Sequence, residues 1–157
     1  MNGWNLNIAD IKSIQTPLSI LDTLCGELSR ITDGRIIARV TEYTPAEGED
    51  EDDSHFTYQM YVTSVRTPRY KYWMFYFSYD IMLYPVSIKM RSDIAEEIGF
   101  FSGGPSFNHY PDVSCKDEEE FRATVEKIIS SKTMGTVLNN LAALNGLNSV
   151  KEEDLPL

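Results

Sequence analysis

His109 and Cys115 are the residues whose types and spacing best suit covalent chemistry in this chain. They lie in and just after a glycine-rich stretch, and the chain holds two histidines and two cysteines in all. A histidine within hydrogen-bond reach of a cysteine can take its proton and leave a nucleophilic thiolate. The pair is therefore the candidate for an enzymatic Cys/His site, although no HExxH, GxSxG or CxxC motif accompanies it.

A run of acidic residues over positions 47–53 is the other concentration of reactive side chains. Six of its seven residues are acidic, but they lack the alternating oxygen ligands and central glycine of an EF-hand loop. No histidine or cysteine pair has metal-ligand spacing, so we expect no metal and no cofactor. Consecutive acids predict a solvated loop that attracts a basic surface. The candidate partner-binding residues are Glu47, Glu49, Asp50, Glu51, Asp52 and Asp53.

Aromatic and basic side chains are interleaved in the middle of the chain. Residues 61–91 carry five basic side chains and one acidic side chain, while the regions before and after them are acidic. Rings and cations on one sheet face can stack on and neutralise a small anionic ligand or a nucleotide. An alternative ligand site therefore lies on the second face of a predicted sheet. Its residues are Tyr61, Tyr72, Met74, Lys89 and Arg91.

These side chains need a scaffold, whose first predicted element is a helix over residues 17–32. Apolar residues recur there at spacings of three and four, Thr16 is a suitable N-cap, and Pro17 suits the first helical turn. Gly34 can end the helix in a left-handed conformation. Alternating apolar residues then predict a strand over residues 35–43.

Two aromatic-rich segments, 56–65 and 70–81, predict an antiparallel hairpin with residues 66–69 as its turn. In this register, each large apolar side chain of one face meets another across the strands. The predicted pairs are Phe56 with Tyr79, Tyr58 with Phe77, Met60 with Phe75 and Val62 with Trp73.

A third antiparallel strand over residues 84–90 continues the meander after a turn at 80–83. It brings Lys89 opposite Met74 and Arg91 opposite Tyr72 on the second face.

The C-terminal third predicts a short helix over 92–98, a long loop over 99–112 and two further helices. The first of these helices begins at Ser114, with Asp117 in a capping-box position. The second covers residues 132–144 and stops at Asn145-Gly146. We thus expect an α+β fold, with an N-terminal helix, a four-stranded, mainly antiparallel meander and two C-terminal helices packed on the sheet. Residues 1–147 form one domain, and residues 148–157 form an acidic flexible tail.

The chain has 157 residues and a net charge of −10, with 42% hydrophobic residues. This composition is typical of one globular domain and excludes bulk nucleic-acid binding, which requires a basic surface. The sequence shows no secretory signal and no apolar run near the roughly 18 residues of a membrane span. We expect a cytoplasmic protein in which Cys25 and Cys115 are free thiols.

The leading hypothesis is a non-catalytic binding protein of the immunity, inhibitor or adaptor kind that acts on a protein with a basic surface. Self-association is also open, because the charge distribution is bipolar. The alternatives are the binder of a small anionic ligand or nucleotide on the sheet face, and an enzyme with the Cys/His site.

Overall fold

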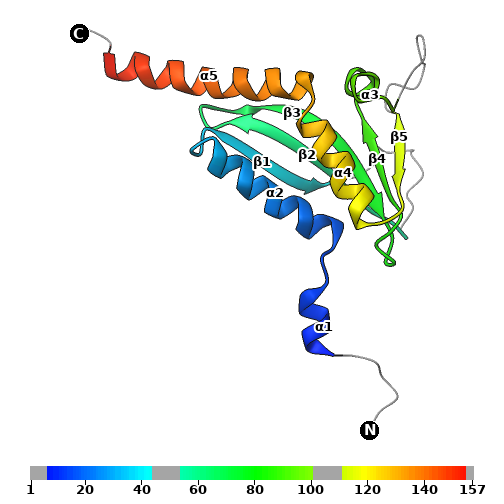
Figure 1. Cartoon of the computed structure of the whole chain (residues 1–157). Helices are drawn as coiled ribbons and strands as arrows, with labels where there is room; N and C mark the ends of the chain where they lie inside the picture. Colours follow the sequence, from blue (N-terminus) through cyan, green and yellow to red (C-terminus); the bar gives the residue numbers. More distant parts are fainter. Residues whose placement is uncertain (1–6, 44–53, 101–110, 155–157) are drawn as a thin grey trace.

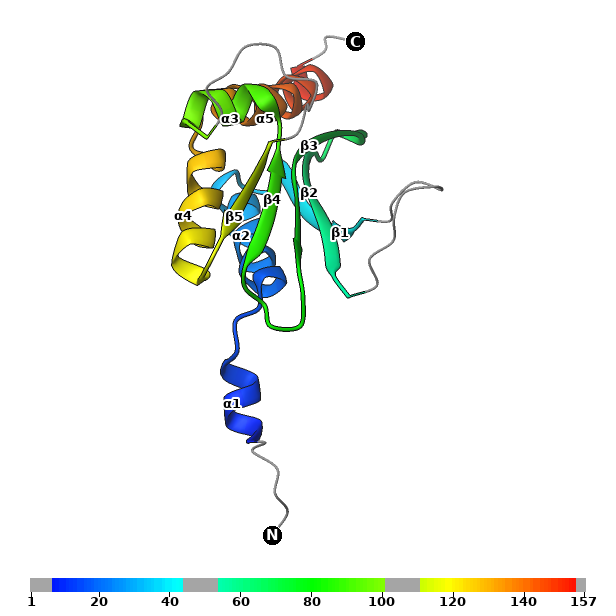
Figure 2. The same cartoon turned by 90° about the vertical axis from the view of Figure 1, so that its right-hand side faces the viewer.

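One antiparallel sheet with helices packed on one of its faces forms the body of the chain (Figures 1 and 2). The computed structural model describes residues 7–43, 54–100 and 111–154. The described helices are α1 Ile8–Ser13, α2 Pro17–Ile31, α3 Ser92–Ile98, α4 Glu118–Ile129 and α5 Lys132–Asp154. The described strands, in sheet order, are β1 Ile36–Glu42, β2 Phe56–Ser64, β3 Thr67–Tyr79, β4 Val86–Met90 and β5 Asp112–Cys115. The α+β class and the antiparallel meander are confirmed, whereas the fifth strand was not predicted.

Helix α2 begins and ends where its sequence predicts. The hydroxyl of Thr16 accepts a hydrogen bond from the backbone N–H of Ser19 at 3.1 Å, and Pro17 occupies the first turn. This bond satisfies one of the N–H groups that have no partner inside the helix. After the helix, Gly34 has a φ of 76°, a left-handed conformation that glycine adopts without strain.

Strands β2 and β3 follow the predicted register only in their outer half. Phe56 pairs with Tyr79 and Met60 pairs with Phe75, but the next residue of β2, Tyr61, pairs with Trp73. Met74 therefore has no partner on β2 and forms a β-bulge, which reverses the alternation of side chains along β3. The predicted pairing of Val62 with Trp73 is wrong as a result.

The hairpin turn is also shorter than predicted. Ser64 pairs with Thr67, so Val65 and Arg66 form a two-residue turn in place of the expected turn at 66–69. A second register irregularity lies between Val62 and Ser64. Val62 pairs with Tyr72 and Ser64 pairs with Thr67, so β3 has more residues in this interval than β2.

The pairing of β3 with β4 differs from the predicted register by two residues. Phe77 pairs with Ile88, and Tyr76 pairs with Lys89. The connection is longer than the predicted turn at 80–83, because β4 begins only at Val86. A shift of two residues leaves each side chain on its predicted face, so the core side of β4 was assigned correctly.

Residues near Cys115 form a strand where the sequence predicted the start of a helix. Ser114 is part of β5, and the N-cap of α4 is Asp117, whose carboxylate accepts a hydrogen bond from the N–H of Glu120 at 2.9 Å. Glu120 in turn accepts a hydrogen bond from the N–H of Lys116 at 2.7 Å. Both Ser114 and Asp117 can cap a helix, and the later one does so because β5 pairs with β4.

The last helix extends beyond its predicted end. Helix α5 continues through Asn145-Gly146 to Asp154, so the predicted stop is wrong. The predicted helix over 92–98 is confirmed as α3, and Arg91 is its N-cap. The division into a domain of residues 1–147 and a tail of residues 148–157 stays a prediction.

The core lies between the sheet and helices α2, α4 and α5, which all lie on the same side of it (Figures 1 and 2). The buried side chains at its centre include Leu21, Met60, Phe75, Phe77, Phe121, Ile128 and Met134. Helix α1, which the sequence did not predict, lies away from the sheet in both views. Within the described parts of the chain, no helix is long and apolar enough to cross a bilayer.

Candidate binding surface on the open sheet face

The sheet face opposite the helices has no helical cover in the described parts of the chain (Figure 2). Its centre carries rings and ammonium groups from three strands and from the residue after β1. We call this set the aromatic-basic face, and it consists of Tyr43, Tyr61, Lys71, Trp73, Tyr76 and Lys89. Arg39, which is exposed, lies opposite Tyr61 on β1.

Tyr61 is the buried centre of this face. Its ring meets the Trp73 ring edge-on at 4.9 Å between centroids, and the Lys71 ammonium lies 5.0 Å from its centroid. Only 7% of Tyr61 is exposed, although it lies outside the main core. Such aromatic and cation–π contacts hold the rings in fixed positions, so the face is preorganised.

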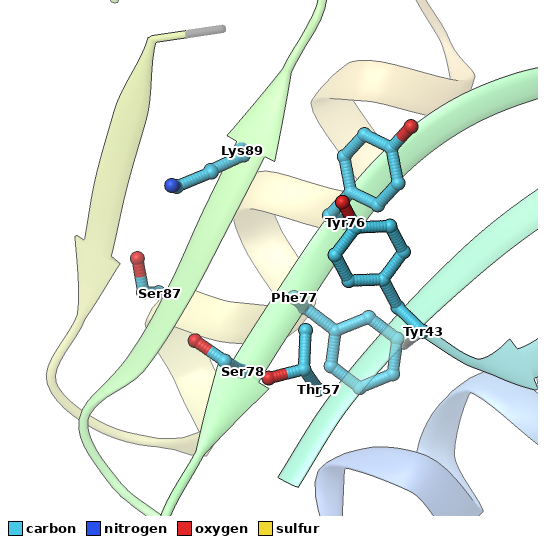
Figure 3. A pocket seen from close by; sticks show the side chains of 7 residues that line it. All are labelled: Tyr43, Thr57, Tyr76, Phe77, Ser78, Ser87 and Lys89. Carbon is cyan, nitrogen blue, oxygen red and sulfur yellow. The ribbon is translucent and has the colours of Figure 1, made fainter. Parts of the chain in front are cut away.

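A hollow of about 560 Å³ lies on this face (Figure 3). The rings of Tyr43 and Tyr76, 5.0 Å apart, line one side of it, and Ser87 and Lys89 line the other side (Figure 3). Thr57 and Ser78 add hydroxyl groups. We call it the open-face hollow, and its volume lies within the range of small-molecule sites.

A second hollow of about 360 Å³ follows the edge of β3 from Tyr70 to Tyr76. We call it the edge groove. It exists because β4 pairs only with residues 75–78 of β3, so the earlier part of β3 extends beyond it. The edge groove shares Tyr76 and Lys89 with the open-face hollow, so the two form one continuous surface.

Arg91 lines the edge groove from just after the end of β4. Its guanidinium lies 5.1 Å from the centroid of the Tyr72 ring and pairs with Asp93 at 3.4 Å. Burial raises the pKa of Tyr72, and the positive charge of Arg91 only partly opposes this rise. The phenol is therefore neutral at physiological pH and can donate a hydrogen bond to an acceptor.

Four of the five residues of the predicted ligand site, Tyr72, Met74, Lys89 and Arg91, line the edge groove, but they do not share one sheet face. Tyr61 and Lys89 lie on the open face as expected, but Met74 is 1% exposed and belongs to the core. Tyr72 pairs with Val62 and packs against the core side, and Arg91 reaches it from beyond the strand rather than from across it. The bulge at Met74 causes both errors, because it exchanges the two faces of β3 before that residue.

The same bulge brings Trp73 and Lys71 to the open face, where sequence reasoning had not placed them. The adjacent apolar residues Met74 and Phe75 are a signal that could have revealed it, because strict alternation places two neighbours on opposite faces of the sheet. Tyr43 and Tyr76 do lie on the face that the alternation predicts.

The candidate Cys/His site is not supported by its cysteine. Cys115 is 1% exposed, and burial raises the pKa of its thiol, which outweighs the opposite effect of its hydrogen bond with the Thr124 hydroxyl. A nucleophilic cysteine needs a lowered pKa and access to solvent. His109 lies outside the described residues. The prediction of two free thiols is confirmed, because Cys25 and Cys115 are both unpaired and buried.

The acidic residues of positions 47–53 lie outside the described residues as well. Two described acids near the start of α4 have local partners: Glu118 pairs with Arg122 at 3.1 Å, and Glu120 pairs with Lys116 at 3.8 Å. Within the described residues, no group of three or more His, Cys, Asp or Glu side chains is placed to hold a metal ion.

Comparisons of the chain with protein-family models, curated proteins and solved structures found no match.

Proposed function

We propose that this chain is a non-catalytic binding protein that binds another protein on its aromatic-basic face. One observation carries the proposal: a preorganised set of aromatic and basic side chains lies on the sheet face that the described helices leave open. Tyr, Trp and Arg dominate the energetics of protein interfaces, and exposed apolar patches with a polar rim often mark sites of protein interaction.

A small anionic ligand or nucleotide is the second candidate, and the open-face hollow favours it. Its volume of about 560 Å³ suits such a ligand, with two tyrosine rings for stacking and Lys89 for an anionic group. The same hollow serves either candidate, so the test must separate them.

A partner with a basic surface is favoured by the net charge of −10 and by the acidic residues of positions 47–53. An acidic protein steers a basic partner towards itself and raises the association rate. If this holds, changing the six acids of that run to Asn or Gln slows association and weakens its dependence on salt. An unchanged rate constant would contradict this contribution.

Site-specific photo-crosslinking tests the proposed function. A photoreactive phenylalanine derivative replaces Tyr76 on the face, and in a matched control it replaces Ile31, which is 68% exposed at the end of α2. In extract of the source cells, we expect a discrete protein adduct from position 76 but not from position 31. Equal adducts at both positions, or none at 76, would contradict the proposal. A small bound mass at 76, seen by native mass spectrometry, would favour the ligand candidate instead.

A further inference from the structure

The part of β3 that extends beyond β4 has a groove on each of its sides. The edge groove lies on one side, and a separate groove of about 360 Å³ lies between β3 and α5. We call the second one the α5 groove. Tyr70 and Tyr72 line both grooves, so a single bound segment that crosses this edge contacts both.

The two grooves differ in chemistry. Lys71, Lys89 and Arg91 line the edge groove, and only Arg91 has an acidic partner among the described residues. The α5 groove is lined by Val137, Leu141 and Leu144 along with the two tyrosines. Leu144 is 45% exposed and Tyr70 is 57% exposed. Exposed apolar groups beside cations that have no acidic partner among the described residues are a typical setting for an anchored, charged peptide.

We propose that this edge of β3 binds a short acidic segment of a partner protein that also carries an apolar anchor residue. The acidic residues lie in the edge groove against Lys71 and Lys89, and the apolar residue enters the α5 groove. This inference rests on the proposed function, because it names the chemistry of the protein that binds there.

Charge favours a short acidic peptide over a nucleic acid. The cations are local, whereas the chain as a whole carries −10. A long polyanion meets that net negative charge beyond the groove, while a segment of a few residues meets only the nearby cations, since screening limits electrostatic interactions to roughly 8 Å at physiological salt. A nucleic acid also has no aliphatic side chain for the α5 groove.

The exposed residues of this edge also limit what else can pair with it. Pro68, Arg69 and Lys71 are exposed, and Met74 forms a bulge. Proline, cations and bulges on an edge oppose pairing with a second sheet. A cationic edge also repels a second copy of itself, which leaves an acidic segment of another protein as the fitting occupant.

Fluorescence anisotropy with labelled octapeptides tests this inference on the full chain. The probe is acetyl-Glu-Asp-Glu-Leu-Phe-Glu-Asp-Glu-amide. One control peptide has Gln and Asn in place of the acids, and another has Ala in place of Leu-Phe. We expect both controls to bind roughly tenfold more weakly at low salt, and we expect binding of the probe to weaken as salt rises.

Variants of the protein locate the site. The double variant Lys71→Gln with Lys89→Gln should bind the probe roughly fivefold more weakly. The matched double variant Lys116→Gln with Lys132→Gln, at exposed positions elsewhere, should bind it as the parent does. Leu144→Ala should weaken binding of the probe that contains Leu-Phe but leave binding of the Ala control peptide unchanged.

Equal effects of the two lysine pairs, or tighter binding of an eight-residue oligothymidylate or of ATP than of the probe, would overturn the inference. The crosslinking at position 76 would still report on the proposed function, so the two failures are distinguishable.

Discussion

The carboxylate of Glu97, at the end of α3, accepts two hydrogen bonds from Thr133 in the first turn of α5. One comes from the backbone N–H at 3.1 Å and the other from the hydroxyl at 2.9 Å. The second carboxylate oxygen of Glu97 accepts a hydrogen bond from the backbone N–H of Lys132 at 2.5 Å. The first backbone N–H groups of a helix have no hydrogen-bond partner within the helix. Glu97, a side chain from α3, therefore caps the N-terminus of α5.

This contact makes stability depend on pH in a defined direction. Desolvation opposes the ionisation of Glu97, but the hydrogen bonds from Lys132 and Thr133 outweigh it and lower its pKa below the ordinary value of 4.5. Because the pKa of Glu97 is lower in the folded state, its ionised carboxylate stabilises the fold at pH values above the unfolded-state pKa. This contribution disappears as the pH falls through the folded-state pKa. We expect Glu97→Gln to have a lower Tm than the parent at pH 7, and the difference to be smaller at pH 3, which lies below the ordinary pKa of the carboxyl group.

Glu96→Gln, at the exposed neighbouring position, is the matched control and should leave Tm unchanged at both pH values. A Tm difference for Glu97→Gln that is constant with pH would mean that the charge of Glu97 has no role.

Met74 should be among the residues most sensitive to substitution. It is 1% exposed, so Met74→Ala leaves a cavity and should lower the free energy of unfolding by about 2 to 5 kcal/mol. Met82 is 75% exposed, and Met82→Ala should change the free energy of unfolding by less than about 0.5 kcal/mol. Urea unfolding of both variants measures the difference, and equal midpoints would show that Met74 is not a core residue.

The two thiols should be nearly inert in the folded protein. Burial, with a smaller contribution from the charge of Asp22, raises the pKa of Cys25 to about 11, and burial also raises the pKa of Cys115. The thiolate is the reacting species, so labelling with a disulfide reagent at pH 8 should be slow for both. Ser114→Cys adds an exposed thiol and should label one equivalent rapidly. Rapid labelling of the parent chain would contradict the buried positions.

The N-terminus of α2 depends on Thr16, whose hydroxyl accepts a hydrogen bond from the backbone N–H of Ser19. Thr16→Ala removes the cap and should cost about 1 kcal/mol of unfolding free energy. Thr23→Ala, at an exposed position within the same helix, is the control and should change it by less than about 0.5 kcal/mol. Equal losses in calorimetry would show that the cap contributes nothing specific.

Sequence reasoning succeeded where one physical signal acted alone. The periodicity and caps of residues 17–32 predict α2, and the large apolar pairs from Phe56 to Met60 predict the outer half of the hairpin. These features depend on residues that are close together within one helix or across one strand pair. Their spacing can be read from the sequence without knowledge of the rest of the fold.

It failed where two alternatives were equally good locally. Along β3, Tyr72 and Trp73 are both aromatic, so either can face the core, and the bulge at Met74 decides between them. Strand β5 is four residues long and is stabilised by pairing with β4, which no local pattern reveals. The candidate surface was therefore predicted in kind, as aromatic and basic, but only Tyr61 and Lys89 of its proposed residues lie on the open face.

The bulge at Met74 also limits how this chain can change in length. Deleting that one residue would restore simple alternation along β3 and turn Trp73 and Lys71 towards the helices, which would place an ammonium group in the core. A single insertion directly before Met74 would have the same effect. The hairpin should therefore accept many substitutions at Pro68 or Arg69, yet reject a gain or loss of one residue between Trp73 and Phe75.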